Sequence, residues 1–221
     1  MVYSDVGIII LGKIVETISK VKLDVFVQSN IFDPLGMNNT FYNPPKEKLH
    51  RIVPTEIDPK SNLIKGYVHD ENAYSIGGVA GHAGLFSKTK DLAIFSQMML
   101  NKGLYGWKRI FKSETIDLFT QRSNIIKGDS RCLGWDSPSG MASGGVYLSN
   151  GSYGHTGFTG TSLWIDPEND MIVILLTNAV HPNRESKTPH YFDWRQRIHS
   201  AVYESVGLTE KNPGLQWRRE W

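Results

Sequence analysis

Two short elements combine side chains that can move protons or polarise a carbonyl group. Tyr3-Ser4-Asp5 comes directly before the first stretch of helical periodicity, and His155-Thr156-Gly157 comes directly before two strand-like segments. Tyrosine, aspartate and histidine can each act as a general acid or base when their surroundings tune their proton affinity. Each tripeptide is common by itself, so the information lies in their order and in the residues around them.

Several other catalytic motifs are absent from the sequence. There is no G-x-S-x-G, no G-x-x-x-x-G-K-[ST] and no H-E-x-x-H, which argues against a nucleophile elbow, a phosphate loop and a zincin site. The glycine-rich run 78–84 has the wrong spacing for a dinucleotide fingerprint. The side chains that could bind a metal match no local ligand spacing: His69, Asp70, His82, His155 and His181. We therefore predict no cofactor and no metal site.

The elements that must position the two tripeptides follow from the hydrophobic periodicity. Apolar residues at three- and four-residue steps predict helices over 6–19, 23–32, 89–102 and 113–121. A last helix is capped by Asp193 and stopped by Gly207, with Trp194 and Ile198 on its expected buried side. Strands are predicted over 161–166 and 171–178. The second strand is apolar on both faces over 171–176, as is typical of a strand at the centre of a sheet.

The remaining segments read as loops. Residues 38–80 are broken by prolines and glycines, and 137–154 is a Gly/Ser-rich stretch that we interpret as a mobile connection. Helices, then a loop region, then a strand hairpin and a closing helix predict an α+β fold around an antiparallel sheet flanked by helices. The strand–helix alternation of a doubly wound fold is missing. We expect one domain over 1–221.

Composition excludes several classes of protein. The 221 residues carry 24 Lys plus Arg and 22 Asp plus Glu, a net charge of +2, so no nucleic-acid partner is expected. The single cysteine, Cys132, cannot form an internal disulfide. The longest apolar run, 6–11, is far shorter than the roughly 20 residues of a membrane span. No signal peptide is recognisable in the chain.

The two tripeptides and their surroundings resemble the serine β-lactamase and penicillin-binding-protein-like family, most closely the serine hydrolases related to class C β-lactamases. The resemblance runs from Tyr3 to Gly207 and is carried by YSDVGIIILGKIVE (3–16), IFDPLGMNNT (31–40), GGVAGHAGLFS (77–87), GHTGFTGT (154–161) and WIDP (164–167). It implies the β-lactamase/DD-peptidase-like fold. Residues 68–82 are also similar to serine hydrolase domains that some bacteria fuse behind a family 3 glycoside hydrolase, which allows such a domain upstream in the parent protein.

The resemblance implies a nucleophilic mechanism. In this family, a serine in a Ser-x-x-Lys motif attacks a carbonyl group, and water then cleaves the acyl-enzyme. The second family motif is Tyr-x-Asn, which corresponds here to Tyr3-Ser4-Asp5. Tyr3 would therefore be the general base and proton shuttle, and Asp5 would contact the substrate.

The third family motif is Lys-Thr-Gly or His-Thr-Gly on a strand at the edge of the sheet. By this resemblance His155 would hydrogen-bond toward the tyrosine or the substrate, and Thr156 would be a polar contact. Gly157 would let the substrate lie against the strand. The backbone N–H of Phe158 would supply one half of an oxyanion hole.

The first family motif is not where the resemblance places it. Ser-x-x-Lys precedes the tyrosine motif by a long segment in the family, whereas two residues precede Tyr3 here. Ser19-x-x-Lys22 and Ser87-x-x-Lys90 lie downstream, and we interpret Ser19 as a helix end and Ser87 as a helix cap. We therefore expect an N-terminally incomplete family fold, an uncovered sheet edge or face, and no acyl transfer by this chain alone.

Two departures from the family motifs bear on the substrate. Asp5 replaces an amide, and an ionised carboxylate cannot donate a hydrogen bond. His155 replaces the permanent cation of a lysine that would hold a β-lactam carboxylate. Both departures favour a carboxylesterase or D-amino-acid peptidase over a true β-lactamase.

The expected partner is a small-molecule ester, amide or peptidoglycan-type substrate, and the parent protein is expected in the periplasm or outside the cell. Two alternatives stay open. The chain could be a non-catalytic module of the same fold that binds cell wall or glycan, or a metal-dependent hydrolase that uses the histidines.

Overall fold

The computed structural model describes residues 3–123, 125, 130–188 and 190–219, and the chain divides into two compact units. The first unit comprises Met1–Ile94 with Val180–Arg184, and the second comprises Phe95–Ala179 with Glu185–Trp221. Within the described residues, no helix is both long and apolar enough to cross a membrane.

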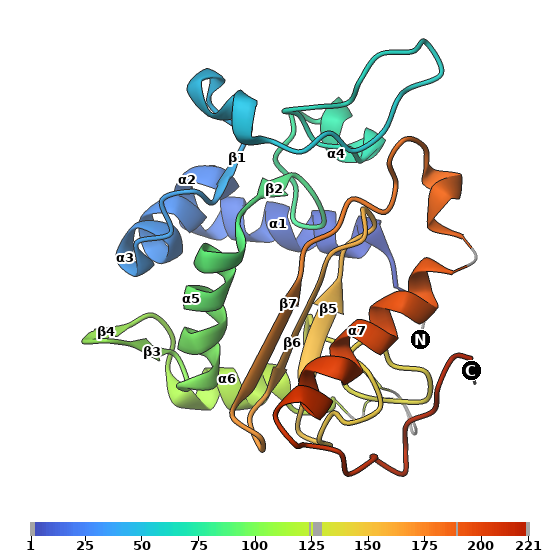
Figure 1. The fold of residues 1–221 in the computed structure, drawn as a ribbon. Coiled ribbons are helices and arrows are strands. Elements are labelled where there is room, and N and C mark those ends of the chain that lie inside the picture. Colours follow the sequence, from blue (N-terminus) through green and yellow to red (C-terminus); the bar gives the residue numbers. More distant parts are fainter. Residues whose placement is uncertain (1–2, 124, 126–129, 189, 220–221) are drawn as a thin grey trace. The chain divides into compact units, whose positions relative to one another are not determined.

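The chain begins with helices, and its longest strands follow one another near the C-terminal end (Figure 1). In order, the elements are α1 (Asp5–Ser19), α2 (Leu23–Val27), the π-turn η1 (Gln28–Phe32), α3 (Asp33–Leu35), β1 (Phe41–Tyr42), the 3-10 helix η2 (Lys46–Arg51), α4 (Glu71–Ser75), β2 (Leu85–Phe86), α5 (Thr89–Leu100), β3 (Leu104–Tyr105), β4 (Lys108–Arg109), α6 (Ser113–Thr120), β5 (Tyr153–Thr156), β6 (Ser162–Asp166), β7 (Met171–Leu175), the 3-10 helix η3 (Arg184–Lys187) and α7 (Tyr191–Ser205).

The first unit is mainly helical and confirms the predicted helices. The predicted second helix is one helical stretch, α2–η1–α3, that ends at Gly36, whose φ of 70° is the left-handed conformation that glycine adopts readily. The region 38–80 is mostly irregular, as predicted. It also contains η2, α4 and the strand β1, which pairs with β2.

A buried ion network closes the loop region of the first unit. The carboxylate of Glu56 accepts hydrogen bonds from the backbone N–H of Arg184 at 2.9 Å and from its Nη2 at 2.8 Å, and it pairs with His69 Nε2 at 2.8 Å. The hydrogen bonds from Arg184 hold the pKa of Glu56 at about 2, against the opposing effect of burial. Glu56 thereby ties the loop after η2 to the segment Val180–Arg184.

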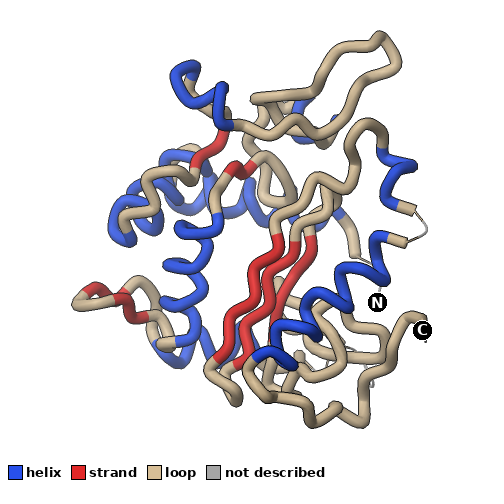
Figure 2. Tube along the Cα trace, viewed as in Figure 1, coloured by secondary structure: helices blue, strands red, loops and turns tan. Residues whose placement is uncertain are grey.

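The second unit is built on an antiparallel sheet of order β5-β6-β7, with α7 against one face (Figures 1 and 2). Its core comprises Val146, Leu148, Trp164, Val173, Tyr203 and Leu215. Both predicted strands are confirmed. However, β7 is an edge strand of the sheet that the described residues form, and Val173 is its one buried residue. The prediction of a central position for this strand was therefore wrong for this chain.

The helix α7 buries the face opposite to the predicted one. Trp194 is 56% exposed and Ile198 41% exposed, whereas the buried side chains are Arg195, Gln196, His199, Ser200 and Tyr203. Several of these polar groups have specific partners: Gln196, for example, donates to two backbone carbonyls at 2.9 and 3.1 Å. Arg195 Nε and His199 Nδ1 are buried without a hydrogen-bond partner among the described residues. Hydrogen bonds such as those of Gln196 lower the cost of burying a polar helix face.

The Gly/Ser-rich stretch 137–154 is part of the core of the second unit and not an exposed connection. Val146 and Leu148 are fully buried within it, and Ser152 is 1% exposed. The hydroxyl of Ser200 on α7 accepts a hydrogen bond from Val146 N–H at 3.2 Å. Small residues permit this close approach, because a Cβ on Gly145 would lie 2.5 Å from the Ser200 hydroxyl.

Candidate functional site

The first tripeptide lies at the start of α1 in the first unit. Tyr3 is 44% exposed, and Ser4 has the extended conformation typical of a residue that precedes a helix. Asp5 is in the first helical turn, where a carboxylate interacts favourably with the helix dipole. The tyrosine of the predicted second motif is thus held at the end of a regular element.

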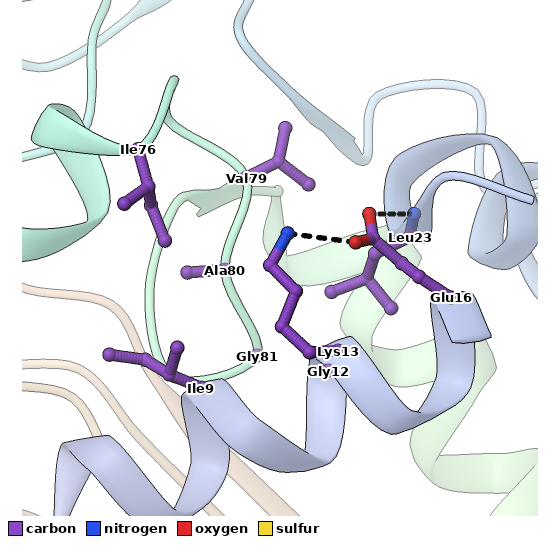
Figure 3. Close-up of a pocket in the computed structure, with 9 residues that line it drawn as sticks. All are labelled: Ile9, Gly12, Lys13, Glu16, Leu23, Ile76, Val79, Ala80 and Gly81. Atoms are coloured by element: carbon purple, nitrogen blue, oxygen red, sulfur yellow. Dashed lines mark hydrogen bonds and ion pairs between the residues drawn. The ribbon is translucent and has the colours of Figure 1, made fainter.

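The glycine-rich loop 77–84 positions α1. A Cβ on Gly81 would lie 2.4 Å from the carbonyl oxygen of Ile8, and a Cβ on Gly12 would meet Gly81 N at 3.3 Å. Figure 3 shows this contact beneath a small pocket, with Lys13 and Glu16 joined by an ion pair of 2.8 Å at its rim. Glycine is required here because the two backbones approach too closely for any side chain.

Asp70 and His82 fix the same loop close to the first turn of α1. His82 Nε2 lies 2.8 Å from Asp70 Oδ1, and that carboxylate also caps α4 by accepting from Ala73 N–H at 2.8 Å. Burial acts to raise the pKa of Asp70, but the hydrogen bonds from Ala73 and His82 outweigh it and hold that pKa below its usual value. The interpretation of His82 as a hydrogen-bonding residue that shapes the loop is confirmed.

One group of side chains in the described residues has the geometry of potential metal ligands. Ligand atoms of Asp5, Asp70 and His82 lie within 4.8 Å of one another. Asp70 and His82 Nε2 are already paired with each other, so the grouping alone does not indicate a metal. Of the other histidines considered above, His69 pairs with Glu56.

The second tripeptide ends β5 in the second unit. His155 pairs with Leu163 of β6, while Gly154 exchanges hydrogen bonds of 2.8 and 3.0 Å with Asp136 on the opposite edge. Because peptide groups alternate between the two edges of a strand, the peptide group of Thr156 faces the same edge as that of Gly154. Phe158 lies beyond the strand, in the turn that connects β5 to β6. A Cβ on Gly157 would lie 2.2 Å from Thr161 Oγ1 and would displace that hydroxyl.

His155 is oriented by two contacts. Its Nδ1 lies 2.9 Å from the carbonyl oxygen of Thr156, and its Nε2 lies 3.4 Å from Nη1 of Arg131. These contacts fit an imidazole that carries its proton on Nδ1 and accepts from the guanidinium on Nε2. Arg131, which also pairs with Asp136, therefore brings a permanent positive charge to this strand.

A second cation adjoins Phe158. The Lys187 ammonium group donates to the carbonyl oxygen of Phe158 at 2.8 Å and lies 3.6 Å from the centroid of its ring. Neither Arg131 nor Lys187 was identified from the sequence. Both are distant from the motif along the chain and lie in segments without periodicity, so no sequence signal marks them.

The structure assigns the predicted site residues to two groups. Tyr3 and Asp5 belong to the first unit, and His155, Thr156, Gly157 and Phe158 belong to the second. Ser19 ends α1, as interpreted from the sequence, and its hydroxyl donates to the carbonyl of Val15 at 2.7 Å. The hydroxyl of Ser87 is 2.8 Å from that of Thr40.

Among the described residues, Ser162 has a histidine within hydrogen-bond distance of its hydroxyl. Ser162 Oγ lies 2.8 Å from His199 Nε2, which is the spacing of a nucleophile and its base. Ser162 is 4% exposed and His199 is fully buried. A substrate carbonyl cannot reach this hydroxyl, so we assign the pair a structural role.

Comparisons with known proteins agree on one family. The Beta-lactamase family model matches residues 1–197. The curated Salmonella heidelberg protein named "Putative D-alanyl-D-alanine carboxypeptidase" is 41% identical over 198 residues, which cover 81% of this chain and 45% of that protein. The chain thus spans about half the length of the curated relatives that it matches.

Solved structures show the same fold. A β-lactamase from Mycobacterium bovis superimposes with a TM-score of 0.62 at 19% identity, over 92% of this chain and 63% of its own. Simvastatin synthase from Aspergillus terreus superimposes with a TM-score of 0.65 at 17% identity, over 89% of this chain and 54% of its own. These matches confirm the predicted α+β fold, and the family match supports a serine hydrolase-like function. The chain therefore belongs to the β-lactamase family, which here includes the penicillin-binding-protein-like serine enzymes.

Proposed function

We propose that this chain forms the proton-transferring and carbonyl-polarising side of an acyl-transfer site, in an enzyme that cleaves D-amino-acid peptides or carboxylic esters. Tyr3 is the general base, His155 orients the tyrosine or the substrate, and Phe158 N–H is an oxyanion donor. Asp5, Thr156 and Gly157 contact the substrate. The attacking serine belongs to a segment outside this chain.

The outward-facing end of β5 carries this proposal. The peptide group of Thr156 faces the edge of the sheet opposite β6, and Phe158 follows in the turn beyond this strand. A peptide substrate binds such an edge by main-chain hydrogen bonds. The motif His155-Thr156-Gly157 therefore lies at a strand edge that a substrate could pair with, as the proposed chemistry requires. A backbone donor at this position stabilises the oxyanion of a tetrahedral intermediate.

The exposed face of α1 supports a serine segment outside the chain. Val6, Ile10, Ile14 and Ile18 recur every four residues and are 62%, 53%, 45% and 78% exposed. An apolar stripe of this length marks a surface that another element covers. Because relatives are about twice as long as the matched region, the rest of the family domain is the natural element to cover it.

The substrate class rests on the relatives and on the local charges. The Salmonella relatives carry the name "Putative D-alanyl-D-alanine carboxypeptidase", a cell-wall activity that supports a periplasmic location for the parent protein. Arg131, within 3.4 Å of His155, adds a permanent positive charge beside this histidine, partly offset by its ion pair with Asp136. A carboxylate-bearing peptide or ester fits this arrangement.

Acylation of the chain alone tests the source of the nucleophile. We expect no burst with p-nitrophenyl acetate or nitrocefin and no acyl adduct in the intact mass, because the serine–histidine pair found among the described residues, Ser162 with His199, is buried. An acyl-serine in this polypeptide would contradict the proposal. The coding sequence upstream of Met1 is a second test, and an in-frame Ser-x-x-Lys there would support it.

The role of Tyr3 can be measured in a protein extended by such a segment. Tyr3→Phe should lower the acylation rate by about 10²- to 10⁴-fold, the usual contribution of a general base. Tyr74→Phe, at a tyrosine of the first unit that is 62% exposed, is the matched control and should leave the rate unchanged. Equal rates in both variants would exclude Tyr3 as the base.

A further inference from the structure

The hairpin β3–β4 carries a tryptophan whose side chain is fully exposed and takes no part in the core. Its register pairs Leu104 with Arg109 and Tyr105 with Lys108, which leaves Gly106 and Trp107 as a two-residue turn. Gly106 has a φ of 56°, as the first central residue of a type II′ turn requires. Trp107 is 101% exposed, more than any other large apolar side chain in the described residues. Figure 1 shows the hairpin extending from the start of α6.

The hairpin is held firmly at its base. Gly103 O accepts from Ile110 N–H at 2.8 Å, and a Cβ on Gly103 would lie 2.2 Å from the carbonyl oxygen of Phe111. Nη1 of Arg109 donates to the carbonyls of Lys102 and Phe111 at 3.0 and 3.1 Å. Trp107 is therefore presented by an ordered support, and its exposure does not result from a loose loop.

The charge around Trp107 has one sign. Residues 102–112 contain Lys102, Lys108, Arg109 and Lys112 and no acidic residue. Lys102 forms an ion pair with Asp117 of α6, which offsets its charge. The side chains of Lys108, Arg109 and Lys112 are exposed. The hairpin thus combines an amphipathic aromatic ring at its tip with Lys108 beside it and with Arg109 and Lys112 nearer its base.

We infer that the β3–β4 hairpin docks this protein on an anionic lipid bilayer. Tryptophan with lysine and arginine is the combination that anchors proteins at the interface between headgroups and acyl chains. Anionic lipids attract each basic side chain by about 1 kcal/mol, which is about fivefold in partitioning. The proposal is independent of the acyl-transfer function proposed above.

A bilayer fits the hairpin better than a glycan does. Sugar sites are concave and offer polar side chains that hydrogen-bond hydroxyl groups, whereas Trp107 stands at the tip of a turn. Residues 102–112 contain no Asp, Glu, Asn or Gln, so the hairpin lacks the side-chain acceptors that neutral sugars need. Charge complementarity points to an anionic, flat partner.

Vesicle co-sedimentation of the whole chain tests the inference. We expect binding to phosphatidylcholine vesicles that contain phosphatidylglycerol, weaker binding at high salt, and little binding to phosphatidylcholine alone. Lys108→Glu with Lys112→Glu, at two exposed lysines, should lower partitioning by at least about 25-fold, from about fivefold per basic side chain. Trp107→Ala should lower it by about tenfold through lost apolar contact.

The control is Lys60→Glu with Lys65→Glu, which makes the same charge change at exposed lysines of the first unit. This variant should retain binding, and circular dichroism should show that all variants are folded. Failure of the wild-type chain to bind the anionic vesicles would overturn the inference. An equal loss in the control pair would overturn it as well, and so would hairpin-dependent binding to isolated peptidoglycan in place of the vesicles.

Discussion

At the scale of single residues, burial sets the proton affinity of His199. This side chain is fully buried beside Ser162. Desolvation, with a smaller contribution from the charge of Arg195, lowers the pKa of His199 to about 4. In the unfolded chain this histidine is protonated below about pH 6.5, whereas in the folded chain it stays neutral until the pH nears 4. The neutral imidazole therefore gives its full contribution to the stability of the folded state above pH 6.5, and this contribution decreases as the pH falls.

His199→Gln should remove this acid sensitivity. The wild-type free energy of unfolding should fall by about 3 kcal/mol between pH 6.5 and pH 4, since one pKa unit corresponds to 1.36 kcal/mol. Over the same pH range, the free energy of unfolding of the variant should fall by about 3 kcal/mol less than that of the wild type. Urea unfolding at several pH values measures this difference. His50→Gln, at an exposed histidine, should behave as wild type. Identical pH dependence of wild type and His199→Gln would exclude the buried imidazole as the cause.

The family pattern in the sequence selects the proposed site residues but not their electrostatic partners. Tyr3, Asp5 and the segment 155–158 could be selected from the sequence because a family pattern joins them. Arg131 could not be selected in this way. Its contact with His155 joins residues that are 24 positions apart, and the sequence between them has no periodic pattern that predicts the contact. Contacts of this kind depend on tertiary packing, which local patterns do not encode.

At the scale of elements, the contact between α1 and the loop 77–84 depends on glycine. A Cβ on Gly81 would lie 2.4 Å from the carbonyl oxygen of Ile8, whereas a Cβ on Gly7, also in α1, has nothing within 4 Å. Gly81→Ala should therefore lower the free energy of unfolding by about 1–3 kcal/mol, as overpacking does. Gly7→Ala should raise it by about 0.5–1 kcal/mol through helix propensity. Chemical denaturation measures both, and a change of the same sign in both variants would contradict this account.

The Glu56 network predicts a second acid-sensitive element. The folded-state pKa of Glu56, about 2, is below the model-compound value of 4.5, so its stabilisation is present above pH 4.5 and lost as the pH falls toward 2. Glu56→Gln should cost about 3 kcal/mol at neutral pH and remove that part of the pH dependence. Equilibrium unfolding of Glu56→Gln and of Glu47→Gln, an exposed control, separates this effect from general charge loss. A neutral outcome for Glu56→Gln would show that the network does not stabilise the loop.

Helix positions could be predicted from periodicity, but the buried face of α7 could not. The apolar residues Trp194 and Ile198 indicated one face, and the fold buries the other. The buried hydroxyl of Tyr203 donates to Asp166 at 2.9 Å. A polar face becomes a core face only when partners on other elements meet it, and those partners are not visible within the helix itself.

At the scale of the whole molecule, the exposed stripe on α1 should make the chain bind apolar probes. Ile10→Glu with Ile14→Glu should reduce the fluorescence of a bound apolar dye severalfold without unfolding the chain, because both side chains are about half exposed. Leu118→Glu, at a residue of α6 that is 52% exposed, is the control. Dye binding that is unaffected by the α1 substitutions would show that the stripe is not the accessible apolar surface.

The fold class could be predicted because strands, turns and helices each carry local signals. The position of β7 in the sheet could not be predicted. The apolar pattern of Met171–Leu175 indicates that both faces of the strand can be buried, but it does not indicate which strands lie beside it. The chain matches about 45% of the length of its curated relatives. If the remainder of such a domain supplied a strand beside β7, the only sign of it in this sequence would be those apolar residues.

The proposed function requires Tyr3 of the first unit and His155 of the second unit to act on one substrate. Cross-linking a Tyr3→Cys/His155→Cys double variant with a short thiol-specific reagent tests it most directly. Cys132 should not interfere, because burial raises the pKa of its thiol to about 11 and the thiolate is the reactive form. We predict a rapid intramolecular cross-link with a reagent whose span matches one substrate molecule. Cross-linking no faster than in a Tyr3→Cys/Trp107→Cys control would contradict the account.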